Sequence, residues 1–218
     1  MREMFEVTSR TEVRRLPARA IYDRAAAHAI LDEAFVCHIA FVGDDGHPVA
    51  IPTNFARDGE RLLIHGSPAS RMLRTLGAAT PLCATVTLVD GLVLAKSAFH
   101  HSVNYRCVVA FGTATAITDL DDKRRALDVI VEHIVPGRSA DARAASDKEL
   151  KATLVLALPL EEVSVKVRTG GPLDDEVDLA LPAWTGVVDI ETRYGAPPDA
   201  PDYARFYQRP GRTARPSP

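Results

Sequence analysis

A dense polar cluster joins an apolar stretch to a helical one at residues 65–71. Its sequence is His65-Gly66-Ser67-Pro68-Ala69-Ser70-Arg71. Ser67 stands where a helix N-cap belongs, and Pro68 suits the first helical position, where an N–H is not needed. The unpaired N–H groups of a helix start, together with the Arg71 guanidinium, can hold an anion such as a phosphate group. The same residues also fit a plain capped turn whose arginine faces solvent.

A second polar cluster opens a long apolar stretch. Its members can hydrogen-bond or stack: His100, His101, Ser102, Asn104, Tyr105 and Arg106. The adjacent histidines suggest metal binding, but no carboxylate or cysteine stands at ligand spacing around them, so we predict no metal site. Serine and asparagine both donate and accept hydrogen bonds, and tyrosine offers a face for stacking. The cluster therefore favours the rim of a site for a planar polar ligand, with closure of a loop as the alternative.

The elements that must position these clusters follow from periodicity and turn chemistry. Asp23 is a suitable N-cap for a helix over 24–34, and a second amphipathic helix is predicted over 119–135. A short helix is expected over 68–78. The predicted strands have apolar and β-branched sequences separated by turn residues, and they are 35–43, 48–56, 61–65, 82–99 (interrupted at Asp90-Gly91), 105–118, 152–160 and 161–169. Tight turns between the first three strands exclude a doubly wound parallel sheet. Seven or so strands and three helices predict an antiparallel barrel with helices packed outside.

Composition limits the classes of function. The chain has 218 residues and a net charge of −3, which gives no electrostatic reason for a nucleic-acid or membrane partner. The longest apolar runs are far shorter than the ~20 residues of a spanning helix, and the N-terminus lacks the apolar segment of a secretory signal. Three cysteines without CxxC spacing are interpreted as reduced core residues, which predicts a cytoplasmic protein. The composition predicts one domain over 12–195 and a disordered Pro/Arg-rich tail over 196–218.

Several segments, in number and order, resemble one known family. This family is the flavin-nucleotide-binding proteins related to pyridoxamine 5′-phosphate oxidase, which include 5-nitroimidazole reductases. The resemblance extends from about Arg14 to Gly186. The matching segments are RLPARAIYDRAAAHAILDEAFVCHIAF, GHPVAIPTNFARDGERLLIHGSPASRMLR, DGLVLAKSAFHHSVNYRCVVAFG, VPGR, ELKATLVLALPLEEVSVKVRTGGPLDD and WTGVV. The resemblance implies an antiparallel split β-barrel of the FMN-binding type, mainly β with peripheral helices. It also implies a homodimer with one FMN in each of two clefts between the subunits.

The resemblance also implies roles for particular residues. The matched positions are Pro52, Thr53, Asn54 and Phe55 on the strand whose backbone lies along the isoalloxazine ring, Ser67, Ser70 and Arg71 at the phosphate, Ser102, Asn104, Tyr105 and Arg106 at the second rim, and Lys166 and Trp184 near the cleft. Cys107 stands where a serine is more usual in the family. His65 has two interpretations: a catalytic proton donor at the flavin edge, or a hydrogen-bonded, half-buried histidine.

The leading functional hypothesis is an FMN-dependent oxidoreductase that acts on a small molecule, with NADH or NADPH as the candidate electron donor. No other nucleophile or nucleotide motif is present: the sequence lacks GxSxG, HExxH, a Walker loop and GxGxxG. The alternative is a non-catalytic FMN carrier or sensor. A third hypothesis is a heme-binding relative in which His100 or His101 ligates the iron, although it leaves the phosphate cluster without a role. Oxidation of pyridoxamine phosphate itself is not predicted, because no second basic pocket for a substrate phosphate can be assigned.

Overall fold

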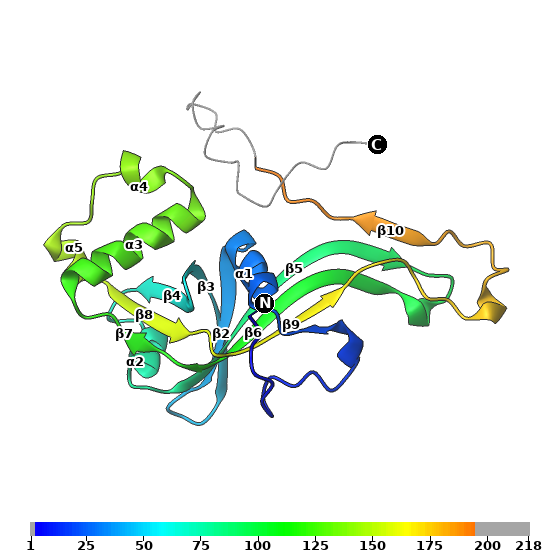
Figure 1. Cartoon of the computed structure of the whole chain (residues 1–218), viewed down its shortest axis with the longest axis horizontal. Helices are drawn as coiled ribbons and strands as arrows, with labels where there is room; N and C mark the ends of the chain where they lie inside the picture. The colour runs from blue at the N-terminus through cyan, green and yellow to red at the C-terminus, as the bar shows by residue number, and fades with distance from the viewer. Residues whose placement is uncertain (1–2, 195–218) are drawn as a thin grey trace.

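Antiparallel pairing organises the body of the protein, a continuous sheet that curls on itself (Figure 1). The computed structural model describes residues 3–194. The ten strands in that part of the chain are β1 (Ala20–Ile21), β2 (Val36–Val42), β3 (Pro48–Asp58), β4 (Arg61–Gly66), β5 (Pro81–Leu94), β6 (Ser102–Thr113), β7 (Thr115–Ala116), β8 (Leu154–Pro159), β9 (Glu162–Arg168) and β10 (Gly186–Asp189). They lie in the order β1-β9-β6-β5-β2-β3-β4-β8-β7, and β10 pairs with β5.

Helices cover the outside of this sheet. The α-helices of the described residues are α1 (Arg24–Glu33), α2 (Arg71–Gly77), α3 (Leu120–Ile134), α4 (Arg138–Asp141) and α5 (Asp147–Lys151), and the 3-10 turns are η1 (Pro17–Arg19), η2 (Ala98–His100) and η3 (Glu176–Asp178). The predicted N-cap of α1 is confirmed, because the Asp23 side chain accepts a hydrogen bond from the Ala26 amide at 2.9 Å. Asp119 caps α3 in the same way. The predicted fold, an antiparallel split barrel with helices outside, is correct.

The split of the barrel lies in β3, which changes partner part-way along its length. Its first half pairs with β2 as far as Asn54, and its second half pairs with β4 from Phe55 onward. The main core fills the space between the two halves and includes Phe55, whose side chain is 0% exposed. Because strand side chains alternate between the two faces, this change of partner leaves the outward residues of the first half, such as Pro52 and Asn54, exposed.

A smaller apolar cluster attaches α3 to the outer face of the second half. It is formed by Ala56, Leu63, Ala126, Ile130, Val155 and Ala157. The N-terminal segment also joins the core, since Phe5 is buried ahead of the predicted domain start and its ring lies 4.3 Å beneath the Arg24 guanidinium. Of the cysteines, Cys37 is buried, whereas Cys83 and Cys107 are half-buried. The predicted tail, 196–218, lies outside the described residues. No helix within residues 3–194 is long and apolar enough to cross a membrane.

The structure corrects two local predictions. Strand β5 is not interrupted at Asp90-Gly91 but runs through it, with a shift of register between Val89 and Gly91. Asp90 is thus the extra residue of a β-bulge, and a bulge redirects a side chain without ending the strand. A Cβ on Gly91 would lie 3.1 Å from the Val188 carbonyl oxygen, so glycine is needed where β10 approaches β5.

The second correction concerns α2, which begins at Arg71 and not at Pro68. Its N-cap is Ser70, and Ser67 belongs to the preceding turn. The reason is that Ser70 has extended backbone angles and its side chain accepts a hydrogen bond from the Leu73 amide. The serine before the proline therefore caps a turn, and the serine after it caps the helix.

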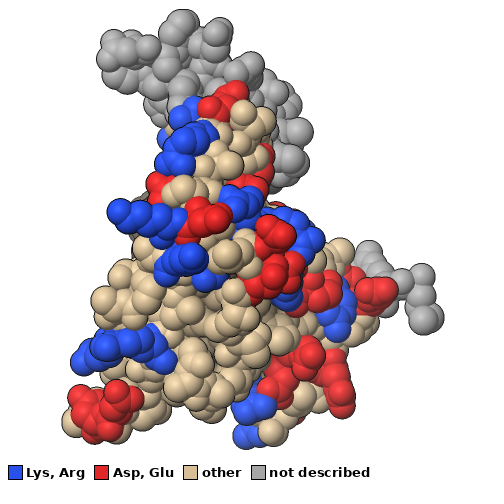
Figure 2. Space-filling model, turned by 90° about the vertical axis from the view of Figure 1, so that its left-hand side faces the viewer, with Lys and Arg blue, Asp and Glu red and all other residues tan. Residues whose placement is uncertain are grey.

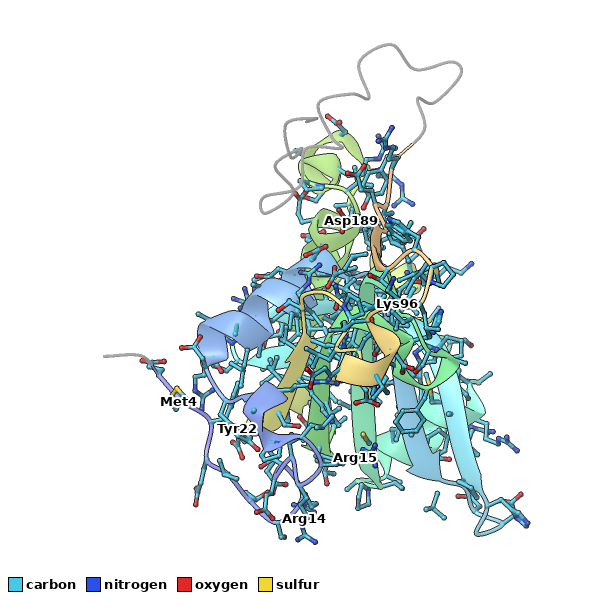
Figure 3. All side chains as sticks on the ribbon, turned by 90° about the vertical axis from the view of Figure 1, so that its right-hand side faces the viewer. Met4, Arg14, Arg15, Tyr22, Lys96 and Asp189 are labelled. Atoms are coloured by element: carbon cyan, nitrogen blue, oxygen red, sulfur yellow. The ribbon has the colours of Figure 1, made fainter. Side chains whose placement is uncertain are left out.

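The outer ends of β5 and β6 extend away from the barrel together with β10, and we call this projection the arm (residues 89–105 and 170–189). It lies to the right in Figure 1, and Figure 3 looks at it end-on. Lys96 attaches the returning segment to the arm, since its Nζ donates to the carbonyl oxygens of Leu181 at 2.5 Å and Ala183 at 2.8 Å. In Figure 3, Lys96 and Asp189 lie on the arm, while Arg14 and Arg15 lie below it on the N-terminal segment.

Candidate functional site

The loop between β4 and α2 presents hydrogen-bonding groups to solvent. The Ser67 side chain accepts a bond from the Ala69 amide at 3.1 Å, and the Ser67 carbonyl oxygen accepts one from the Ser70 amide at 2.9 Å. The first intrahelical bond of α2 runs from the Arg74 amide to Ser70 at 3.0 Å, so the amides of Arg71 and Met72 have no acceptor within the helix. Ser67 and Arg71 are exposed. The loop can therefore hold an anion with amides, hydroxyl groups and one guanidinium.

The side chains of this loop carry more of the anion-binding capacity than the helix does. Helix α2 has only seven residues, so few aligned peptide dipoles support its N-terminus. Among the described residues, no hydrogen bond or ion pair engages the Arg71 guanidinium. A charged group of this kind forms a stronger hydrogen bond to an anion than a neutral donor does. Arg71 is therefore the strongest hydrogen-bond donor that this loop could offer to an anion.

The exposed half of β3 lies beside this loop. Strands β3 and β4 pair at Phe55 and Ile64, so Asn54 and His65 are the next residues on the open side of that pair. Pro52 and Asn54 are exposed and Thr53 is half-buried. Phe55 has its side chain in the core, so only its backbone can reach a ligand. The structure thus brings the β3 segment and the 65–71 cluster together, as the sequence predicted.

His65 is half-buried at the end of β4, opposite Val155 of β8. Its Nδ1 atom is buried and has no hydrogen-bond partner among residues 3–194, so the hydrogen-bonded interpretation is not supported for that atom. Burial lowers the pKa of the ring below its ordinary value of 6.5. His65 is therefore neutral at neutral pH, and any proton that it donates comes from a neutral imidazole.

In the second cluster, two of the predicted rim residues are engaged within the chain. Arg106 forms bidentate contacts with Asp90 (2.9 and 2.6 Å) and with Glu33 (2.5 and 3.1 Å), which connect β6 to the β5 bulge and to α1. These contacts raise the pKa of Arg106, with the Asp90 bond as the largest cause and the Glu33 bond next. Arg106 is therefore positioned by two carboxylates, and any contact with a flavin would compete with them.

Asn104 is also engaged inside the chain. It is 8% exposed, donates to the Gly170 carbonyl oxygen at 3.1 Å and accepts from the buried Arg168. Arg168 was not among the residues predicted from the sequence, although it is a charged residue at the end of an apolar strand, just before Gly170-Gly171. The other predicted positions of this region are less engaged. Ser102 and Tyr105 are half-buried, and Trp184 is exposed.

The two predicted clusters are far apart in one chain. The 65–71 loop and α2 lie at the left of Figure 1, whereas Ser102 begins β6 in the arm at the right. Lys166 lies on β9 opposite Cys107, next to the Arg106 end of the second cluster, and its Nζ donates to the Arg15 carbonyl oxygen at 3.0 Å. The structure therefore joins the 65–71 loop to β3 but does not join it to Ser102 of the second cluster within one chain.

Charge is mixed over the face that lies to the left in Figure 1. Figure 2 shows basic and acidic groups interspersed around a broad uncharged area on that face. This face has no large single-sign area among the residues drawn in colour, so it adds no electrostatic reason for a nucleic-acid partner. Within residues 3–194, no group of three or more His, Cys, Asp or Glu side chains could hold a metal ion.

The sequence of this barrel matches the family model described as pyridoxamine 5′-phosphate oxidase over residues 23–167. The chain belongs to that family. The family is one of flavin-binding split barrels, and the match covers both β3 and the 65–71 loop. A search of curated proteins found no match.

Solved structures extend the comparison over nearly the whole chain. The flavocytochrome Anf3 from Azotobacter vinelandii is 39% identical with a TM-score of 0.84, covering 91% of this chain and 97% of its own. The FAD and heme binding protein from Mycobacterium smegmatis is 42% identical with a TM-score of 0.80, covering 88% and 94%. A 5-nitroimidazole antibiotic resistance protein from Bacteroides thetaiotaomicron is 24% identical with a TM-score of 0.59, covering 68% and 86%, and shares the fold.

Proposed function

We propose that this chain is a flavin-dependent oxidoreductase acting on a small molecule, with the flavin phosphate held by Ser67, Ser70 and Arg71. The observation that carries the proposal is the exposed 65–71 loop, whose amides, hydroxyl groups and guanidinium face solvent in a chain of a flavin-binding family. A bound flavin would supply the electron transfer, and the protein supplies binding, orientation and polarity.

The residues of this chain have separate tasks in the proposal. Arg71 and the two serines bind the phosphate. The exposed backbone of β3 around Pro52 and Thr53 orients the ring, and Phe55 anchors that strand in the core. His65 stands next to both groups as a neutral imidazole, which can hold a proton near the ring without bringing a charge into it.

The proposal includes a homodimer. The end of β6 that begins at Ser102 lies in the arm, on the other side of the molecule from α2 (Figure 1), so we assign Ser102 and Tyr105 to the second rim of a second copy. Light scattering of the flavin-loaded protein tests this, with a dimer expected, and a flavin-loaded monomer would contradict it. The cysteine pattern supports a reducing compartment, so we propose a cytoplasmic location with NADH or NADPH as the electron donor.

The identity of the flavin can be tested by titration. The sequence predicts FMN, because one anion cluster suits one terminal phosphate. The relative that is 42% identical is titled as an FAD and heme binding protein, which makes FAD the competing expectation. Both nucleotides carry the phosphate next to the ribityl chain, so the 65–71 loop suits either. Titration of the apoprotein with both decides, and FAD binding as tightly as FMN would overturn the FMN prediction.

A flavocytochrome, in which heme accompanies the flavin, is the second candidate function. It is favoured because the two solved structures above that exceed 30% identity are titled as a flavocytochrome and as an FAD and heme binding protein. The chemistry of the donor set agrees: His101 is exposed, with one ring nitrogen directed to a backbone carbonyl. A heme would supply one-electron transfer, and the protein would supply an axial ligand.

The absorbance spectrum of the purified protein is the first test, with flavin bands expected. Anaerobic addition of NADH or NADPH should then bleach the flavin bands, and a nitro compound or a pyridoxal-type compound should restore them. Failure of both donors and both acceptors would leave a carrier or sensor of flavin, without catalysis. A Soret band beside the flavin bands would favour the flavocytochrome.

A further inference from the structure

His101 has the arrangement that is typical of a metal-ligating histidine. Its Nδ1 lies 2.9 Å from the Ser97 carbonyl oxygen, and a carbonyl only accepts hydrogen bonds, so Nδ1 carries the proton and Nε2 keeps a lone pair. The ring is exposed. Ligating histidines in proteins almost always donate their other N–H in this way, which fixes the tautomer and raises the basicity of the ligating nitrogen.

The neighbouring histidine, His100, is half-buried, and its contact with a carboxylate leaves Nδ1 as the nitrogen that could meet a ligand. His100 has its Nε2 3.1 Å from a carboxylate oxygen of Asp175, and its ring packs edge-on against Phe99. His47 is the other exposed histidine with Nδ1 close to a backbone carbonyl, that of Asp45 at 3.2 Å. It directly follows the acidic Asp44–Gly46 turn, just before β3, and does not lie in the arm. The two exposed imidazoles therefore differ in their surroundings and not in their tautomer.

An exposed apolar row lies beside His101. Leu92 of β5 is directly opposite Val103 of β6 on one side and Val188 of β10 on the other, and the three are 43%, 37% and 46% exposed. His101 directly precedes β6, two positions before Val103 in the sequence, and so lies at the same end of the arm as this row. Phe99, 90% exposed, adds an aromatic ring close by. A contiguous apolar surface of this kind marks a binding site more often than scattered apolar residues do.

A heme suits this combination better than a simple ion does. A structural metal ion needs about four protein ligands, whereas heme iron needs one or two axial ligands and its porphyrin needs apolar surface. We propose that His101, through Nε2, is an axial ligand of a heme iron, and that Leu92, Val103 and Val188 cover one face of the porphyrin. This proposal rests on the flavocytochrome candidate above and assigns its heme to the arm.

Titration of the full-length protein with hemin tests the proposal by absorbance and by the EPR signal of the ferric iron. The wild type should show a histidine-ligated spectrum. His101→Ala should bind hemin at least ~100-fold more weakly, since loss of an outer-shell partner alone typically costs 10–100-fold. Added imidazole should restore the histidine-type spectrum. His47→Ala, which removes an equally exposed imidazole, should leave both affinity and spectrum unchanged.

Cooperative urea unfolding is the folding control, because Ser102 and Tyr105 of the arm also belong to the flavin site proposed for the second copy, so flavin content alone does not report on folding. Leu92→Lys provides a second variant, which keeps His101 and should weaken hemin binding by introducing charge into the apolar row. A His101→Ala protein that retains the wild-type affinity and spectrum would overturn the assignment while leaving the flavocytochrome candidate intact. A wild type that binds flavin but not hemin would remove both the assignment and that candidate, and the flavin proposal would stand.

Discussion

Replacing Arg71 by alanine should weaken flavin nucleotide binding without disturbing the fold. Arg71 is the first residue of α2, it is exposed, and its guanidinium has no acceptor among the described residues. Its removal therefore breaks no internal contact, and a surface change of this kind usually costs less than ~0.5 kcal/mol of stability. The helix keeps its cap, since Ser70 still accepts from the Leu73 amide.

The loss of affinity follows from the strength of one charge-assisted contact. Hydrogen bonds to charged groups contribute about 1.5–3 kcal/mol, which corresponds to about one to two decades in the dissociation constant. The seven-residue helix offers little compensation, because the dipole of a helix end contributes only ~0.3–1 kcal/mol. Fluorescence titration of the apoprotein with FMN and FAD gives both constants. Two controls are needed. One separates the contribution of the phosphate from that of the flavin ring, and the other tests whether the position of the arginine matters as well as its charge.

Riboflavin lacks the phosphate, so it should bind the wild type and Arg71→Ala with similar affinity. Arg74→Ala removes an equally exposed arginine in the last turn of α2, and it should change the affinity for the nucleotides much less. If Arg71→Ala binds FMN and FAD as tightly as the wild type does, Arg71 of the 65–71 loop does not bind the flavin phosphate. The 65–71 cluster would then be only a capped turn.

Two further predictions concern buried charge. Arg106→Met leaves the carboxylates of Glu33 and Asp90 facing each other. It should lower the free energy of unfolding by about 1–3 kcal/mol, because a half-buried pair lies between the ~0.2–1 kcal/mol of exposed pairs and the ~3–5 kcal/mol of buried ones. Urea unfolding measures the free energy of unfolding, and the additional change Glu33→Gln should restore part of the stability that Arg106→Met loses. If Arg106→Met is as stable as the wild type, the ion pairs of Arg106 with Glu33 and Asp90 contribute little to stability. His65 should make stability depend on pH. Because burial lowers its folded pKa, the unfolded chain binds a proton more readily, so its contribution is complete above about pH 6.5 and is lost as the pH falls. The difference in unfolding free energy between wild type and His65→Gln should shift against the wild type on acidification. If the difference between wild type and His65→Gln does not change with pH, the lowered pKa of His65 is contradicted. The control is His47→Gln, which removes an exposed histidine.

The sequence by itself determined the features that depend on neighbours along the chain. Asp23 caps α1 as predicted, and the helix predicted over 119–135 forms as α3 with Asp119 as its cap, because an N-cap bond joins residues two or three positions apart. The strands follow from alternation and turn chemistry, and the order of the matched segments identified the family. The predicted start of α2 was wrong, because Ser67 and Ser70 both suit a cap by type and only the backbone angles show that Ser70 is the cap.

Only the tertiary structure decided which polar residues face a ligand and which are engaged inside the chain. Arg106 finds Glu33 across 73 residues, and Asn104 finds the Gly170 carbonyl across 66. Such pairs are set by the register of β5, β6 and β9, and the Asp90 bulge shifts that register by one residue. The same long-range pairing places the second cluster on the arm and the 65–71 loop at the far side of the barrel. Local patterns carry no information about register, because the hydrogen bonds that define it join residues that are distant in sequence.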